Sequence, residues 1–180
     1  MATSRRSKPR SVLRERPVIF LTLGTQLPFD RLVRALDKAA KSLSEPAFGQ
    51  IGHSKYRPEE FEATAFLSPS DFVAHLESAR VVVGHAGIGT ILSGMKTGKP
   101  LLLMARRADL GEHRNDHQLA TAEQVKGTPG IYIVEDEQDI AHHLRSPRLV
   151  GLGSNASPAR TRLTNALSDA IFGCELPRSQ

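Results

Sequence analysis

The sequence predicts an α/β fold, a Rossmann-like parallel sheet with helices on both faces. Short apolar segments alternate with segments whose apolar residues recur at helical spacing, which is typical of parallel βαβ units. The apolar segments 18–23, 81–83 and 101–104 are hydrophobic throughout instead of alternating, as strands covered on both faces are. Ligands of such folds bind beyond the carboxyl ends of the strands.

The first half of the chain predicts three strands and two helices. An apolar strand over 18–23 stops at Gly24-Thr25. A helix begins near Pro28 and Asp30, because the apolar residues that follow recur every three or four positions. Shorter strands are expected at 47–52 and 63–67. A second helix begins at Ser68, with a proline in its first turn, and its apolar face consists of Phe72, Leu76 and Ala79.

The second half continues the alternation. A strand over 81–83 precedes a helix over 88–96, which Gly98 and Pro100 end. A polar loop over 106–115 follows the strand at 101–104. The remaining expected elements are a helix at 116–126, a strand at 131–134, a helix at 138–144, a loop at 151–157 and an amphipathic helix at 158–172.

Composition and charge exclude several classes of protein. No apolar run of the 180 residues approaches the roughly 20 that a membrane-spanning helix needs. The single cysteine, Cys174, excludes an intramolecular disulfide and fits a reducing, cytoplasmic compartment. The net charge of +5 arises in the first seventeen residues, which hold six Lys and Arg against Glu15 alone. A neutral body with a basic tail is not the pattern of a nucleic-acid-binding fold, so no nucleic-acid partner is expected.

The same charge distribution suggests the domain boundaries. We expect residues 1–16 to form a basic, disordered tail, residues 17–175 one ligand-binding domain, and residues 176–180 a second tail. The basic tail is either a solvated extension or a segment attracted to an anionic membrane surface or an acidic partner.

A glycine-containing turn follows the strand at 81–83, where residues 85–90 read His-Ala-Gly-Ile-Gly-Thr. The first N–H groups of the next helix have no partner within the helix, and they carry the positive end of its dipole. Gly87 and Gly89 let an anion approach this backbone, and His85 and Thr90 add side-chain donors. The turn therefore suits a phosphate or diphosphate. The alternative is that the glycines serve the geometry of the turn alone.

A polar segment over 106–124 follows the next strand and therefore lies at the same edge of the sheet. It combines donors and acceptors, as sugar hydroxyls require. Three alternatives remain open: Asp116 only caps a helix; Arg106, Arg107 and Arg114 are solvated charges; or His113 and His117, with Glu112 and Asp116, bind a metal. The metal is disfavoured because the glutamate is not in the metalloprotease position, so none is expected. His142, His143 and the acidic run 135–137 are expected to be solvated.

Read together, the segments HAGIGT, GKPLLLMARR and GEHRNDHQLATAEQ resemble the C-terminal, donor-binding half of family 28 glycosyltransferases. They are most similar to stand-alone versions of that half, which are subunits of two-part enzymes of the dolichol pathway and of bacterial exopolysaccharide synthesis. The segments LTLGTQLPFDRLVRALD and QIGHSKYRP look like the first strands and loops of this half. The resemblance covers about residues 17–134.

The resemblance implies half of a GT-B fold that binds a UDP-sugar as substrate, without a cofactor. It places the diphosphate on residues 85–90, which are His85, Ala86, Gly87, Ile88, Gly89 and Thr90. It places Gly24 and Thr25 on the loop facing the cleft, Phe66 and Leu67 near the base, and Asp116, His117 and Gln118 on the donor sugar. Many relatives carry a carboxylate for the ribose where this chain has Ser93, and Glu112 would take over that role.

The implied activity is hexosyl transfer to a lipid-linked glycan in polysaccharide or glycoconjugate biosynthesis. A helix N-terminus can stabilise the leaving diphosphate without a metal. The acceptor hydroxyl needs a general base, and the sequence offers only His85 and Asp30 as candidates. In one-chain relatives the acceptor half supplies this group, so we expect a membrane-anchored acceptor-binding subunit that brings the chain to the cytoplasmic membrane face. The alternatives are a non-catalytic nucleotide-sugar-binding module and a Rossmann-like oxidoreductase, although the glycines do not follow the dinucleotide-binding order.

Overall fold

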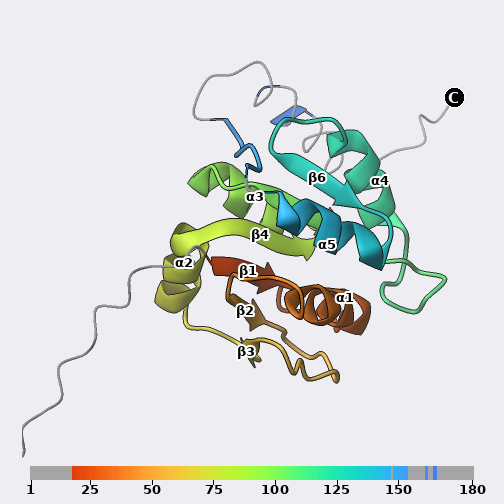
Figure 1. Cartoon of the computed structure of the whole chain (residues 1–180). Coiled ribbons are helices and arrows are strands. Elements are labelled where there is room, and N and C mark those ends of the chain that lie inside the picture. The colour runs from red at the N-terminus through yellow and green to blue at the C-terminus, as the bar shows by residue number, and fades with distance from the viewer. Residues whose placement is uncertain (1–17, 147, 154–160, 162–163, 166–180) are drawn as a thin grey trace, which may run out of the picture.

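The computed structural model describes residues 18–146, 148–153, 161 and 164–165. Within these residues, six parallel strands form one sheet in the order β3-β2-β1-β4-β5-β6, and five helices pack against it (Figure 1). The strands are β1 Val18–Thr22, β2 Ala47–Gln50, β3 Glu62–Thr64, β4 Ala79–His85, β5 Leu101–Met104 and β6 Ile131–Val134. The helices are α1 Asp30–Ala40, α2 Pro69–Ser78, α3 Ile88–Thr97, α4 His117–Val125 and α5 Glu137–Arg145.

The elements agree closely with those expected from the sequence. The largest differences concern β4, which begins at Ala79 instead of Val81 and ends at His85, and β3, which ends at Thr64 instead of Leu67. Ser68 caps α2, because its hydroxyl accepts a hydrogen bond from the N–H of Asp71. The expected tails at 1–16 and 176–180, and nearly all of the expected helix at 158–172, lie outside the described residues.

Two hydrophobic cores lie on opposite faces of the sheet. On one face, Ile19 and Leu21 of β1 pack with buried residues of α1 and α5. On the other face, Phe20 packs with buried residues of α2, α3 and α4. Alternate residues of one strand therefore enter different cores, which explains why the central strands are apolar at every position. The α/β class with helices on both faces is confirmed.

The strand order creates a crevice between β1 and β4. The chain leaves β1 through α1 toward β2 and β3, and it returns through α2 to β4 on the other side of β1. The loops that follow β1 and β4 therefore diverge, and ligands of open α/β sheets bind at such a point. Gly84 allows α3 and β1 to lie close to β4 beside this crevice. A Cβ at this position would lie 2.8 Å from Thr90 Cγ2 and 3.0 Å from the carbonyl oxygen of Thr22.

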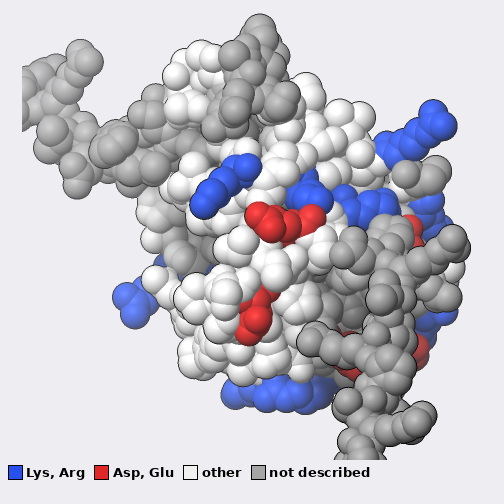
Figure 2. Space-filling model, turned by 90° about the vertical axis from the view of Figure 1, so that its left-hand side faces the viewer, with Lys and Arg blue, Asp and Glu red and all other residues white. Residues whose placement is uncertain are grey.

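Charged side chains are spread over the surface. Figure 2 shows Lys and Arg in separate groups, with Asp and Glu between them, on the left-hand side of the molecule as drawn in Figure 1. Positive charge is therefore not gathered into one patch over the described part of this face. Among the helices of the described residues, none has the length and apolarity that crossing a bilayer would take.

Candidate functional site

A cleft of about 950 Å³ opens at the crevice between β1 and β4. Its walls are the loop after β1, the start of α3 and the start of α2, and residues that follow β5 close one end. None of the described residues that line it is Asp or Glu, whereas Lys96, Arg106, His85 and His113 all line it. The cleft therefore favours an anionic ligand.

The first turn of α3 presents free donors to this cleft. The N–H groups of Thr90 and Ile91 donate to the carbonyl oxygen of Gly87. Those of Gly87, Ile88 and Gly89 donate to no acceptor within the described part of the chain. These three N–H groups lie at the positive end of the helix dipole, where an anion would bind.

The two glycines of the turn serve different purposes. A Cβ at Gly87 would collide with the imidazole of His85, so Gly87 is required by the packing of this ring. A Cβ at Gly24, whose φ is +73°, would lie 2.9 Å from Cε1 of the same ring. A Cβ at Gly89 would meet no atom within 4 Å. The alternative that the glycines serve the geometry of the turn alone therefore accounts for Gly87. Of the two turn glycines, only Gly89 leaves open space above the backbone.

His85 is a neutral side chain at the base of the cleft. Its Nδ1 lies 3.2 Å from the hydroxyl oxygen of Thr90. Burial, together with the positive charge of Arg106 and, more weakly, His113, lowers the pKa of His85 to about 4, against an opposing backbone hydrogen bond with Thr22. A neutral imidazole can donate one hydrogen bond to a phosphate. Because general bases work best with a pKa near the working pH, His85 is poorly suited to take the acceptor proton.

Two further residues named from the sequence line the cleft, and so does Gln50, which the sequence analysis did not name. Gln118 is buried, and its Oε1 accepts a hydrogen bond of 3.1 Å from the N–H of Arg106. Leu67 donates its N–H to Oε1 of Gln50 at 2.9 Å, and both residues line the cleft. Gln50 ends a strand of unremarkable sequence, so only its position at the carboxyl end of β2 could have indicated it.

Other residues named from the sequence lie outside the cleft lining. Phe66 is 46% exposed and packs edge-to-face with His53, with ring centroids 5.2 Å apart. Asp116 and His117 are exposed at the start of α4. Asp116 is the N-cap residue but forms no side-chain cap, because its Oδ1 accepts from the N–H of Ala108 at 2.9 Å instead.

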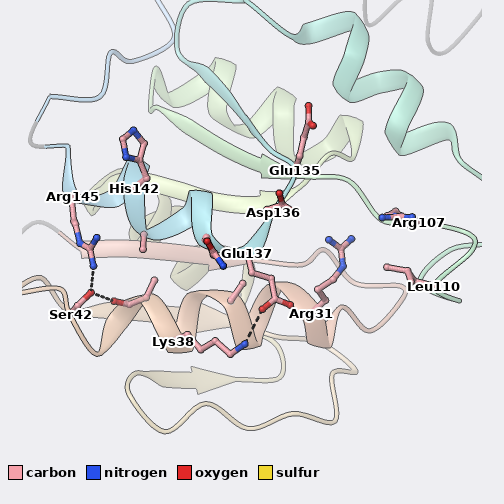
Figure 3. A pocket seen from close by; sticks show the side chains of 14 residues that line it. Arg31, Lys38, Ser42, Arg107, Leu110, Glu135, Asp136, Glu137, His142 and Arg145 are labelled. Atoms are coloured by element: carbon pink, nitrogen blue, oxygen red, sulfur yellow. Dashed lines mark hydrogen bonds and ion pairs between the residues drawn. The ribbon is translucent and has the colours of Figure 1, made fainter.

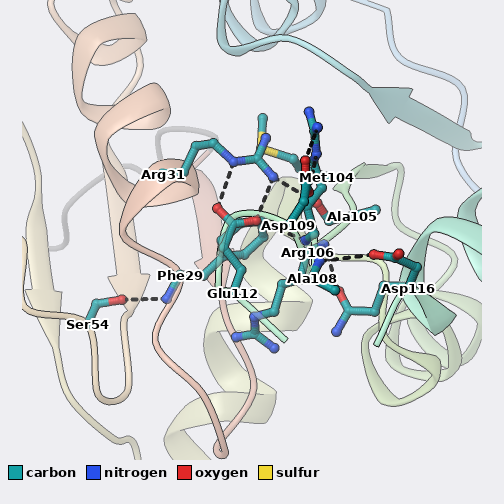
Figure 4. Close-up of polar contacts among 12 residues, drawn as sticks. Phe29, Arg31, Ser54, Met104, Ala105, Arg106, Ala108, Asp109, Glu112 and Asp116 are labelled. Carbon is teal, nitrogen blue, oxygen red and sulfur yellow. Dashed lines mark hydrogen bonds and ion pairs between the residues drawn. The ribbon is translucent and has the colours of Figure 1, made fainter. Parts of the chain in front are cut away.

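Glu112 forms a partly buried ion pair with Arg31 of α1 (Figure 4). Its Oε1 lies 2.7 Å from Nε of Arg31, and its Oε2 accepts from Nη2 of Arg31 at 2.8 Å and from the N–H of Arg107 at 3.0 Å. Both carboxylate oxygens are thus occupied away from the cleft. Ser93, which does line the cleft, donates its hydroxyl to the carbonyl oxygen of Gly89. The ribose role suggested for Glu112 receives no support from these contacts.

Asp30 is likewise occupied elsewhere. Its Oδ1 accepts hydrogen bonds from the N–H groups of Lys55 and Tyr56, at 2.9 and 3.3 Å, and it does not line the cleft. This arrangement supports a role in holding the loop after β2 and gives no support to a role as general base.

The alternative that Arg106 is a solvated charge is wrong. Its side chain is only 3% exposed, lines the cleft and donates to two carbonyl oxygens of the loop after β1. Arg107 is exposed and pairs with Asp109, as a surface arginine would. Sequence reasoning could not separate these neighbours, because both follow the same strand and only the direction of each side chain differs.

A second groove, of about 940 Å³, lies between α1 and α5 (Figure 3). Its charges pair with one another or with nearby groups: Lys38 with Glu137 at 3.1 Å, Arg145 with the Ser42 hydroxyl at 3.0 Å. His142 is exposed there, while His143, expected to be solvated, is half-buried against Tyr132 and burial lowers its pKa. No cluster of three or more His, Cys, Asp or Glu suited to a metal occurs among the described residues. The cleft is therefore the better candidate site.

Fold and cleft together define the class of protein: a Rossmann-like domain corresponding to the C-terminal half of GT-B glycosyltransferases. Residues 18–146 match the glycosyltransferase family 28 C-terminal domain. The chain belongs to this family.

Individual relatives agree with this assignment. The chain is 27% identical over 118 residues to the human UDP-N-acetylglucosamine transferase subunit ALG13, a match that covers 59% of the chain and 10% of that protein. The solution structure of ALG13 is similar with a TM-score of 0.55 at 15% identity, over 82% of the chain and 94% of that structure. The kitacinnamycin glycosyltransferase is similar with a TM-score of 0.56 at 20% identity, over 86% of the chain and 39% of that structure. The chain thus spans a small part of the human relative and less than half of the kitacinnamycin enzyme.

Proposed function

We propose that the chain is a glycosyltransferase subunit that binds a UDP-sugar in the cleft. The observation that carries the proposal is the set of free N–H groups at Gly87, Ile88 and Gly89, which face a cleft lined by cations and by no described carboxylate. A diphosphate matches this arrangement in charge and in its need for donors. UDP is preferred as the nucleotide because the human relative is named a UDP-N-acetylglucosamine transferase subunit.

The reaction is transfer of the hexosyl group from UDP to a hydroxyl of a lipid-linked glycan. The bond between the anomeric carbon and the diphosphate breaks, a new glycosidic bond forms, and the acceptor proton passes to a base. The N-terminus of α3 stabilises the negative charge that grows on the leaving diphosphate, without a metal.

A membrane-anchored partner subunit supplies the acceptor site and the base, at the cytoplasmic membrane face. Two observations support a partner. The human relative is named a subunit. In addition, the candidate bases of this chain are poorly suited, because Asp30 is bonded to the loop after β2 and the pKa of His85 is lowered to about 4.

Ligand titration tests the donor class. Isothermal calorimetry would measure binding of UDP, UDP-glucose, UDP-glucuronate, UDP-N-acetylglucosamine and NAD to the full chain. We expect the uridine compounds to bind and NAD not to bind. Preference for NAD over every uridine compound would overturn the proposal. Co-expression with an acceptor subunit, followed by transfer assays, would then separate an enzyme subunit from a non-catalytic nucleotide-sugar-binding module.

Replacement of His85 by alanine tests whether the neutral imidazole donates a hydrogen bond to the diphosphate. We expect UDP to bind about tenfold more weakly, because one hydrogen bond of about 1.4 kcal/mol is lost. The matched control is His142→Ala, which removes an exposed histidine of α5 outside the cleft and leaves the affinity unchanged. Undiminished affinity of the His85→Ala protein, measured by calorimetry, would remove the proposed role of this side chain.

A further inference from the structure

Arg106 is a buried cation without an ion-pair partner in the described part of the chain. It follows β5 directly, its side chain is 3% exposed, and its guanidinium carbon lies 5.1 Å from the ring centroid of Phe29. Burial lowers the pKa of Arg106 to about 10, against an opposing effect of Glu112, so the group stays charged at neutral pH. The carboxylate of Glu112 is itself bonded to Arg31. A buried charge of this kind is costly unless something compensates it.

The guanidinium holds both ends of the loop after β1. Nη2 donates to the carbonyl oxygen of Leu23 at 3.0 Å and to that of Leu27 at 2.6 Å. The residues between these carbonyls, Gly24 to Gln26, form one wall of the cleft. The position of this wall therefore depends on a side chain that comes from the other side of β4.

Arg106 has one buried nitrogen without a hydrogen-bond partner in the described residues. This nitrogen is Nε. Unpaired buried donors are rare, because each costs the free energy of its lost hydration. Arg106 lines the cleft together with His85 and the first turn of α3. An anion in the cleft would compensate the buried charge that the protein itself leaves unpaired.

We propose that Arg106 is a positioning residue of the donor cleft, which holds the loop 23–27 and supplies a fixed positive charge to the diphosphate. This inference rests on the proposed function. It adds to the proposed donor site a residue, Arg106, whose side chain contacts no other charged side chain of the described cleft lining. It distinguishes Arg106 from Arg107, whose guanidinium is exposed and paired with Asp109.

Three variants separate the charge from the hydrogen bonds. R106K keeps the charge, R106Q keeps a donor for one carbonyl, and R106M removes both. UDP affinity is expected to fall about thirtyfold in R106M and R106Q, while R106K recovers part of this loss. Uridine, which carries no phosphate, is expected to bind R106Q and the wild type alike. The matched control R107M, an adjacent arginine outside the cleft, is expected to bind UDP as the wild type does.

The pKa of His85, measured by NMR, distinguishes a charge effect of Arg106 from a purely structural role, because a structural role alone would leave this pKa unchanged. His85 faces the charges of Arg106 and His113. Loss of the Arg106 charge is expected to raise the pKa of His85 in R106Q and R106M and to leave it unchanged in R106K. Equal pKa values in all three variants would contradict the fixed charge.

The wild-type protein provides a test that does not depend on the folding of any variant. The Nε–H resonance of Arg106 is expected to shift when UDP is added and to stay in place when uridine is added. If the wild type binds no UDP, the proposed function fails. If it binds UDP but the Nε–H resonance does not move, or if R106M binds UDP as tightly as the wild type, the inference about Arg106 fails by itself.

Discussion

Replacement of Gly89 by valine is expected to weaken UDP binding by about a hundredfold or more while the fold stays intact, because two hydrogen bonds to a charged group are lost. Gly89 is the second residue of α3, and a Cβ there would meet no atom within 4 Å. The valine Cβ is therefore accommodated without a clash. The valine methyl groups would fill the space through which a diphosphate reaches the N–H groups of Ile88 and Gly89.

Calorimetry with UDP and thermal unfolding would be measured together. The matched control is Gln138→Val, which places the same side chain at the second residue of α5, in the groove outside the cleft. It is expected to bind UDP normally. A Gly89→Val protein that binds UDP within twofold of the wild type would place the ligand away from the start of α3, and the proposed site would be wrong.

Replacement of Asp37 by alanine is expected to lower the free energy of unfolding by about 3 kcal/mol, because three donors lose the charged acceptor that they share. Asp37 is a 3% exposed residue of α1. Its Oδ2 accepts from the Tyr56 hydroxyl at 2.7 Å, and its Oδ1 accepts from the N–H groups of Glu59 and Glu60 at 3.0 and 2.9 Å. These bonds join α1 to the segment between β2 and β3. Urea denaturation would measure the loss, and Tyr56→Phe, which removes one bond only, should cost about 1 kcal/mol.

The contribution of Asp37 is also expected to depend on pH. Burial alone would raise the pKa of this carboxyl, but the Tyr56 hydroxyl, the two N–H groups and nearby Lys41 outweigh burial and hold the pKa below its ordinary value. A carboxyl whose folded-state pKa is lowered stabilises the protein above its unfolded pKa of about 4. This stabilisation is lost as the pH falls through the folded pKa. When the pH is lowered below about 4, the free energy of unfolding should therefore fall less in Asp37→Asn than in the wild type. If the free energy of unfolding of the two proteins fell in parallel with pH, this account would be contradicted.

Local sequence patterns were sufficient to predict the helices and strands and the edge of the sheet at which we expect a ligand to bind. Apolar runs, helical spacing, the helix start at Ser68 and the helix end at Gly98 involve residues only a few positions apart. They can therefore be recognised in a single sequence. The turn at 85–90 was found in the same way. Its free N–H groups depend only on the strand before it and the helix after it.

The partners of the polar side chains depended on how distant segments pack. Glu112 meets Arg31 across 81 residues, and Arg106 meets Leu23 across 83. Neither contact has a local signal, because each exists only after β5 lies beside β4 and β4 beside β1. Tertiary packing therefore decided that Glu112 serves an ion pair, that Arg106 lines the cleft, and that Gly89, unlike Gly87, has open space at its Cβ position.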